Sequence, residues 1–313
     1  MIEVNDLTVK FQIPSSRLFG KDTLTALENA DFTVSENEVI GLAGESGSGK
    51  STLGKAMLQL VPASGQVIYS GKNLIQLKRK ELLPLRKDLQ IIFQDPYSSM
   101  NPRFTVFEIL TEGLKIHSSV SPSEAKEKAE SAMEKVGLKK EHLERYPHEF
   151  SGGQRQRICI ARTLILNPKF IVCDEITSAL DVSNQAQIIN LLTGLKRETG
   201  ISLLFISHDL GVLGHISDRI AVMYLGRIVE LGSREEIRKN PAHPYTRALF
   251  SSIFSLGGHR KSAPVTGEIP SVLNKPKGCY FHTRCPEAKD ICRNERPAGK
   301  EVSKGHFSEC HFS

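Results

Sequence analysis

The 313-residue sequence has no apolar run close to the roughly 18 residues that a membrane-spanning helix needs. Its longest apolar segments, such as Leu203–Ile206, have the length of buried strands. Residues 1–6 include acids and no basic-then-apolar pattern, so no secretory signal is expected. There is also no internal repeat or low-complexity tract, and the composition is 39% hydrophobic and 24% charged. These absences predict a soluble, intracellular, globular chain of about two domains.

Positive and negative charges are nearly balanced over most of the chain. Lys and Arg number 41 against 35 Asp and Glu, a net charge of +6. Residues 258–313 hold ten basic and six acidic side chains, so +4 of the excess lies there and +2 in the rest. The basic run 78–80 is short and has no aromatic residues between its charges. We therefore expect no nucleic-acid partner.

Strand and helix patterns alternate through the rest of the sequence. Buried-type strands are predicted at 38–43, 170–173 and 202–207, and strands also at 4–11 and 31–34. Helices are predicted after Ser51, from Ser121 to Gly137 behind a capping-box pattern, and around Ile188–Leu195. This alternation favours a largely parallel α/β core. The composition shifts towards Gly, Pro, Lys and Cys near residue 257, where we place a domain boundary.

A phosphate-binding loop is predicted between the strand at 38–43 and the following helix. The segment fits G-x-x-x-x-G-K-[ST]-T in the strand-to-helix context that this motif requires. Its glycines let backbone N–H groups surround phosphate oxygens, while a lysine neutralises charge and a serine hydroxyl binds Mg²⁺. The residues concerned are Gly44, Ser46, Gly47, Ser48, Gly49, Lys50, Ser51 and Thr52.

Two acids follow the buried strand at 170–173. Asp174 is predicted to reach the Mg²⁺ shell, and Glu175 to polarise the attacking water. Taken alone, the pattern also fits a strand followed by a helix-capping acid. Its combination with the phosphate loop favours nucleotide hydrolysis.

Several further motifs resemble those of ABC-transporter ATPases and occur in the same order as in that family, over residues 1 to about 255. The segment 150–157 (FSGGQRQR) resembles the signature motif, and Gln94 in FQDP resembles the Q-loop. Residues 178–181 (SALD) resemble the D-loop, and His208 after a strand resembles the switch histidine. Phe11 is at the position where this family stacks an aromatic ring on adenine, although a core phenylalanine would give the same sequence.

The resemblance implies an α/β fold with a P-loop NTPase core, a parallel sheet, an antiparallel β subdomain and a helical arm. The implied domains are a nucleotide-binding domain at 1–257, with its arm at about 97–162, and a small Cys-rich extension at 258–313. The implied activity is Mg²⁺-dependent ATP hydrolysis by head-to-tail pairs of subunits. The implied catalytic residues are Lys50, Gln94, Glu175 and His208. The implied Mg²⁺ ligands are Ser51, Gln94 and Asp174. Further implied ATP contacts are Phe11, Ser151, Gly152, Gly153, Gln154 and Asp181.

Two positions depart from the family pattern. Ile176 replaces the usual proline after the catalytic glutamate, and Phe150 replaces the usual leucine before Ser-Gly-Gly. Neither change removes a reacting group, so we expect a competent site with modest effects on loop rigidity.

Four segments resemble the oligopeptide and dipeptide importer branch: residues 94–103, 240–249, 267–271 and 278–286. The resemblance implies two separate permease subunits, a paralogous second ATPase subunit or a second copy of this chain, and indirectly an extracytoplasmic binding protein. It places the chain peripherally on the cytoplasmic face of the cell membrane. Import of nickel chelates or another small peptide-like solute is the alternative within this branch. A soluble non-transport ABC ATPase is the alternative from another class, although such proteins usually carry two cassettes or a coiled-coil insertion.

Four of the six cysteines crowd the C-terminal segment. Cys279, Cys285, Cys292 and Cys310 have the spacing C-x5-C-x6-C-x17-C, which in a reducing compartment predicts one metal centre. Thiolates suit both Zn²⁺ and iron–sulfur clusters, and the spacing does not choose between them. The resemblance implies a [4Fe–4S] cluster, with zinc as the alternative. The nearby His282, His306 and His311 are each close enough in sequence to replace one cysteine.

Overall fold

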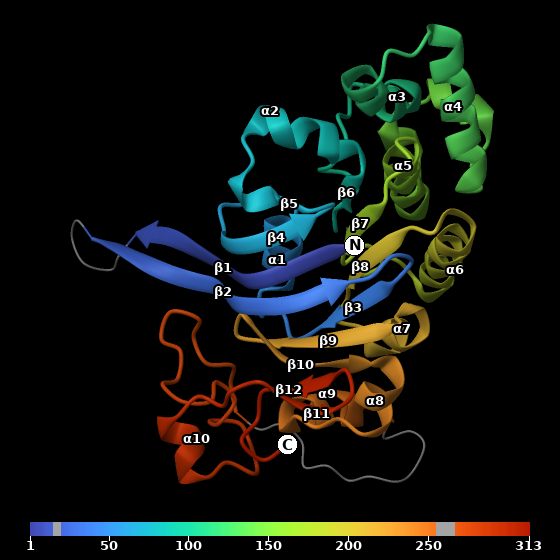
Figure 1. The fold of residues 1–313 in the computed structure, drawn as a ribbon. Helices are drawn as coiled ribbons and strands as arrows, with labels where there is room; N and C mark the ends of the chain where they lie inside the picture. Colours follow the sequence, from blue (N-terminus) through green and yellow to red (C-terminus); the bar gives the residue numbers. More distant parts are fainter. Residues whose placement is uncertain (15–19, 255–266) are drawn as a thin grey trace. The chain divides into compact units, whose positions relative to one another are not determined.

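The computed structural model describes residues 1–14, 20–254 and 267–313, which form two compact units (Figure 1). Unit 1 comprises residues 1–35, 39–76 and 206–313, and unit 2 comprises residues 36–38 and 77–205. Along the described residues, no helix has both the length and the apolar character needed to cross a membrane.

Unit 1 contains most of the strands and six short helices among the described residues. Its strands are β1 (Ile2–Pro14), β2 (Lys21–Val34), β3 (Val39–Ala43), β4 (Ser64–Tyr69), β5 (Lys72–Asn73), β9 (Arg219–Tyr224), β10 (Arg227–Ser233), β11 (Lys300–Ser303) and β12 (His306–Ser308). Its helices are α1 (Lys50–Met57), η1 (Leu74–Gln76), α7 (Leu210–Ile216), α8 (Arg234–Lys239), α9 (Pro244–Phe254) and α10 (Asp290–Asn294).

One sheet of unit 1 is antiparallel, with the order β2-β1-β4-β5. The apolar residues of β1 do not alternate strictly, because Val4 and Leu7 are both fully buried although three positions apart. A register shift between them accommodates this spacing, and Asp6 within it has a φ of 51°. The predicted strand at 4–11 and the antiparallel subdomain are therefore confirmed, with an irregularity at Asp6.

The other strands of unit 1 lie in the order β11-β12-β10-β9-β3. β3 and β9 are parallel, with Ile40 opposite Arg219, and all five residues of β3 are buried. The C-terminal segment joins this sheet, since β12 pairs antiparallel with β10 and places Leu231 opposite Phe307. The predicted boundary at 257/258 lies outside the described residues.

Unit 2 contains three strands and several helices. The strands β6 (Leu89–Ile92), β7 (Phe170–Asp174) and β8 (Ser202–Ile206) lie in the order β8-β7-β6, and β6 and β7 are parallel. The helices are α2 (Arg79–Leu82), η2 (Leu83–Lys87), α3 (Val106–His117), α4 (Pro122–Lys135), η3 (Lys140–Glu144), η4 (Pro147–Glu149), α5 (Gly152–Leu164) and α6 (Val182–Thr199).

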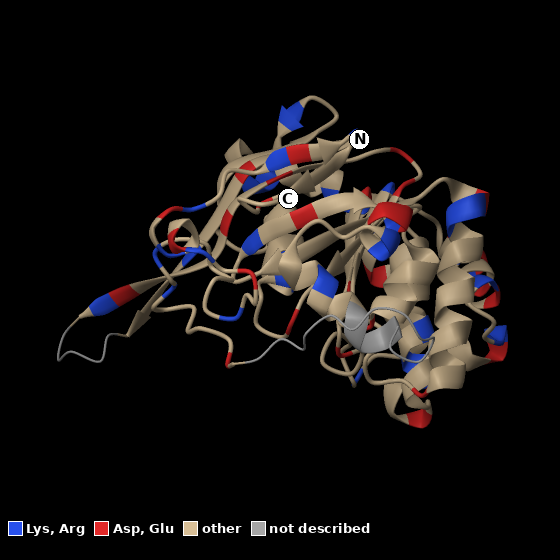
Figure 2. Cartoon of the chain, turned by 90° about the horizontal axis from the view of Figure 1, so that it is seen from below, with Lys and Arg blue, Asp and Glu red and all other residues tan. Residues whose placement is uncertain are grey.

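The predicted helix behind Ser121 is confirmed as α4. The Ser121 hydroxyl accepts a hydrogen bond from the Glu124 N–H at 3.2 Å, and Pro122 occupies the first turn. Ala125, Ala129 and Met133 form its buried face, which packs against α3 and α5. Basic and acidic residues are interspersed along the elements visible in Figure 2, as the charge counts lead one to expect.

Candidate functional site

The predicted phosphate loop runs from the buried strand β3 into α1. Gly49 is the N-cap of α1, with a left-handed φ of 103°. A Cβ at this position would lie 2.6 Å from the Ala26 carbonyl oxygen, so both the conformation and the space require glycine. The sequence therefore builds a tight loop that exposes backbone N–H groups at the start of a helix, which is an anion-binding arrangement.

Two polar side chains of the loop point inward. Lys50 is 4% exposed, and its Nζ donates to the carbonyl oxygens of Gly44 at 2.8 Å and Glu45 at 3.0 Å. The Ser48 hydroxyl is buried and has no hydrogen-bond partner among the described residues. A buried unpartnered hydroxyl beside a lysine and a row of N–H groups fits a phosphate ligand.

Residues outside the motif also hold the loop, and no role was predicted for them. Tyr245, fully buried, accepts a hydrogen bond at its hydroxyl from the Glu45 N–H at 3.1 Å. Burial raises the pKa of Tyr245, so this hydroxyl stays neutral. The Glu45 carboxylate is paired with Arg284. Tyr245 and Arg284 both lie in the segments that resemble peptide importers, and that was the only signal in the sequence.

The other predicted nucleotide contacts of unit 1 are Phe11 and His208. Phe11, on β1 opposite Leu24, is half-buried, which differs from a fully buried core phenylalanine. His208 is exposed and follows Ser207, whose N–H donates to the Leu42 carbonyl oxygen of β3 at 3.3 Å. This bond places Ser207, the residue before His208, beside the end of β3, the strand that leads to the phosphate loop.

The predicted acids of unit 2 end the buried strand β7. Asp174 is 4% exposed, while Glu175 is half-buried and has a left-handed φ of 48°. The Gln94 amide donates to the Glu175 carboxylate at 3.2 Å, so the structure brings these two predicted catalytic residues together. Ile176, which stands where the family has proline, is 2% exposed and packs in the core.

The signature segment forms the start of α5. The Ser151 hydroxyl accepts from the Gln154 N–H at 3.3 Å, and the Gln154 side chain accepts from the Ser151 N–H at 3.0 Å. This capping box leaves Ser151 and Gly152 exposed at a helix N-terminus, a position that favours anions. Asp181 caps α6 by accepting hydrogen bonds from the Asn184 N–H at 2.9 Å and from the Asn184 side-chain amide at 2.7 Å, and these two bonds lower the pKa of Asp181.

All four C-terminal cysteines line one small cavity of about 20 Å³ in unit 1. Cys279 also donates its N–H to the Cys292 carbonyl oxygen at 2.8 Å, and none of the four forms a disulfide. Burial, and then the neighbouring thiols, raise the pKa of Cys279 to about 11. By contrast, Cys159 and Cys173 are buried core thiols.

Two of the three nearby histidines line the same cavity. His282 and His311 do so, whereas His306 lies 2.7 Å from Glu230 in a buried pair. The prediction that His306 could replace a cysteine ligand is therefore wrong, because His306 does not line the cavity of the four cysteines and its Nε2 faces Glu230. In the described parts of the chain, no group of three or more His, Cys, Asp or Glu side chains could hold a metal ion in the present arrangement.

Two family models match the sequence. Residues 27–178 match "ABC transporter", and residues 229–292 match "Oligopeptide/dipeptide transporter, C-terminal region". The second match includes Tyr245, Arg284 and three of the four clustered cysteines.

Full-length relatives and solved structures agree with these matches. The chain is 46% identical to the oligopeptide transport ATP-binding protein AppF of Bacillus subtilis, covering 100% of this chain and 97% of the relative. It is 47% identical to the oligopeptide transport ATP-binding protein OppF of Haemophilus influenzae, over 99% and 96%. A dimeric ATP-binding cassette bound to ADP and phosphate is similar, with a TM-score of 0.67, 27% identity and coverage of 75% and 99%.

Proposed function

Because the chain belongs to the ATP-binding subunits of ABC-type oligopeptide transporters, we propose that it hydrolyses ATP to energise peptide import through separate permease subunits. Identity of 46–47% over essentially the whole length of two oligopeptide transport ATP-binding proteins is the observation that carries this proposal. The phosphate loop supports the activity, since its lysine, its unpartnered serine hydroxyl and its N–H groups suit a nucleotide.

In this proposal the phosphate loop binds the β- and γ-phosphates, and Lys50 neutralises part of their charge. Ser51 and Asp174, with Gln94, would hold Mg²⁺, which spreads the negative charge that develops on the phosphate oxygens. Glu175 orients the attacking water and accepts its proton, and Gln94 positions the Glu175 carboxylate. His208 contacts the γ-phosphate, and Phe11 stacks on adenine.

The N-terminus of α5, which carries the signature segment, would contact the nucleotide bound by a second subunit. Ser151, Gly152, Gly153 and Gln154 present an exposed helix N-terminus, which would close over the γ-phosphate bound by a partner. Asp181 adds a contact at the same interface. The partner is either a paralogous ATPase or a second copy of this chain, and the similar cassette with ADP and phosphate is itself dimeric.

The cysteine cavity would hold a metal centre. Four cysteines line one cavity, and thiolates suit both Zn²⁺ and iron–sulfur clusters. The present arrangement of the described side chains forms no closed metal-ligand group, so either centre would require these side chains to turn towards it. Cys279, Cys285, Cys292 and Cys310 would ligate a [4Fe–4S] cluster, with zinc as the alternative.

Anaerobic purification followed by analysis of iron, acid-labile sulfide and zinc tests this centre. We expect about four irons and four sulfides per chain, as the cluster formula requires, and a brown protein. A Cys292→Ser variant should lose the iron, whereas Cys173→Ser, a core thiol, should keep it. One zinc without sulfide would refute the cluster, and the absence of any metal would refute the site.

The transport function is tested in cells that lack this chain. Uptake of a radiolabelled tripeptide should fall, and the wild-type chain but not Glu175→Gln should restore it. Unchanged peptide uptake with reduced nickel uptake would favour the alternative cargo, and no effect on either would favour a non-transport ATPase. The chain should sediment with membranes only when permease subunits are present, as expected of a peripheral subunit on the cytoplasmic face.

A further inference from the structure

The segment between the first two cysteines of the cavity, Cys279–Cys285, reaches the phosphate loop. Arg284 donates two hydrogen bonds to the Glu45 carboxylate, from Nη1 to Oε2 at 2.7 Å and from Nη2 to Oε1 at 2.9 Å. Arg284 is 8% exposed and the Glu45 side chain 27% exposed, so the guanidinium is buried and the carboxylate is half-buried. Two parallel hydrogen bonds of this kind fix the orientation of both partners.

An aromatic cluster supports the same contact. Phe281 packs edge-on against Tyr224 and lies beside Tyr245, with centroid distances of 5.3 Å in both pairs. Tyr245 binds the Glu45 N–H, and Arg284 binds the Glu45 side chain. Both the backbone and the side chain of Glu45 are therefore held from outside the loop.

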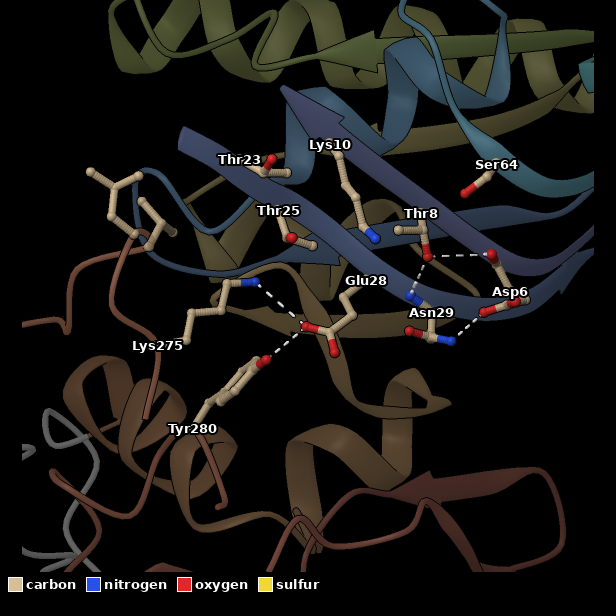
Figure 3. Close-up of a pocket in the computed structure, with 12 residues that line it drawn as sticks. Asp6, Thr8, Lys10, Thr23, Thr25, Glu28, Asn29, Ser64, Lys275 and Tyr280 are labelled. Carbon is tan, nitrogen blue, oxygen red and sulfur yellow. Dashed lines mark hydrogen bonds and ion pairs between the residues drawn. The ribbon is translucent and has the colours of Figure 1, made fainter. Parts of the chain in front are cut away.

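Tyr280 reaches the other end of the loop through a series of hydrogen bonds. Its hydroxyl donates to Glu28 at 2.7 Å, beside the Lys275 ammonium (Figure 3). The Glu28 N–H donates to the Gly226 carbonyl oxygen, and the Gly226 N–H donates to the Ser48 carbonyl oxygen, both at 2.8 Å. The segment thus connects to Glu45 directly and to Ser48 through β2 and the β9–β10 turn.

We propose that Arg284 is a positioning residue for nucleotide binding, which acts by holding Glu45 so that the phosphate loop keeps its binding conformation. The inference rests on the proposed function, because it assumes that ATP binds this loop. Glycines at positions 44, 47 and 49 all have positive φ, so the loop has much conformational freedom to lose. External contacts that restrict the free loop reduce the entropy cost of binding.

The test uses the full-length chain with Mg²⁺ and the fluorescent nucleotide MANT-ATP. Arg284→Met should raise the Kd for MANT-ATP and the KM for ATP by about tenfold, while kcat at saturating ATP stays within about twofold. Arg247→Met is the matched control, because Arg247 forms a 2.9 Å ion pair with Glu287 on the surface of the same unit. Its Kd should equal that of the wild type.

Two further variants separate positioning from other roles. Arg284→Lys keeps the positive charge but cannot form the bidentate pair with the Glu45 carboxylate, so the Kd for MANT-ATP should rise severalfold. This variant still tests the proposal if Arg284→Met does not fold. The double variant Arg284→Met/Glu45→Gln removes both charges, so neither is left unpaired. If Arg284 acts by positioning Glu45, the Kd for MANT-ATP should stay about tenfold higher than that of the wild type.

The outcomes distinguish this inference from the proposed function. A wild-type Kd in Arg284→Lys and Arg284→Met would overturn the inference alone. Recovery of the wild-type Kd in the double variant would also overturn it, because charge neutralisation would then explain the effect. Failure of the wild-type chain to bind MANT-ATP would overturn the proposed function and, with it, this inference.

Discussion

At the scale of single residues, Glu175 carries the sharpest prediction for activity. Its carboxylate follows a fully buried strand and accepts a hydrogen bond from Gln94. In Glu175→Gln the amide can still accept this bond but cannot take a proton from water. We expect kcat for ATP to fall by at least about 10²-fold, with MANT-ATP binding retained.

Glu235→Gln is the control for this change. Glu235 is half-exposed and forms a surface ion pair with Lys239 at 2.7 Å, so its loss should leave kcat unchanged. Turnover of Glu175→Gln within about twofold of wild type would show that another group activates the water.

A second residue, His306, predicts a pH dependence of stability. Its pKa is raised chiefly by the hydrogen bond to Glu230, with Glu236 adding to the effect. Because the pKa is higher in the folded chain than in the unfolded chain, this stabilisation is complete below about pH 6.5 and is lost as pH rises through the folded pKa. His306→Gln should therefore lower the urea midpoint more at about pH 6 than at about pH 8.5.

Glu230 keeps hydrogen bonds from the Ala242 and His243 N–H groups, so the loss of its His306 partner should cost about 2 kcal/mol at the lower pH. His215→Gln, an exposed histidine of the same unit, should show no such pH-dependent difference. An equal loss for His306→Gln at both pH values would mean that the ring is neutral in the folded chain.

At the scale of secondary-structure elements, two helix N-caps provide a matched pair. Ser151 caps α5 and Ser121 caps α4, with hydroxyl-to-N–H distances of 3.3 Å and 3.2 Å. Replacing either serine by alanine should lower the free energy of unfolding by about 1 kcal/mol. Only Ser151→Ala should also reduce ATPase activity, because only this cap is proposed to face a nucleotide.

Urea unfolding and steady-state ATPase assays of both variants check this expectation. Equal stability losses with equal activities would mean that Ser151 serves the helix alone. A lower ATPase rate in Ser121→Ala would show that loss of stability, and not a lost nucleotide contact, reduces the activity.

At the scale of the whole molecule, one exposed surface is expected to meet the permease. Tyr97 is 50% exposed, and the Arg155 guanidinium lies 5.2 Å from its ring centroid. It begins the segment 97–103, between the Q-loop and the helices of the predicted arm. A photo-crosslinking amino acid at position 97 should capture a permease subunit in membranes.

The same probe at Thr23, an exposed position on β2, is the comparison. Capture from Thr23 but not from Tyr97 would contradict the proposed permease surface. Gln94, three residues before this segment, would transmit the nucleotide state to it through its bond to Glu175.

The sequence by itself determined the features that depend on local spacing. The phosphate loop, the acids after β7 and the cap at Ser121 follow from short patterns whose chemistry is complete within a few residues. A glycine with positive φ or a serine before a helix has the same physical role wherever the chain folds. The local structures of the proposed nucleotide site were therefore predictable from the sequence, while the roles of their residues towards ATP stay predictions.

Only the tertiary structure decided which distant residues support these motifs. Arg284 and Glu45 are 239 positions apart, and His306 and Glu230 are 76 apart. No local pattern encodes such pairs, because they form only when β12 joins β10 and the C-terminal segment packs in the same unit as the phosphate loop. The same packing gathers the four cysteines around one cavity and assigns His306 to a carboxylate instead.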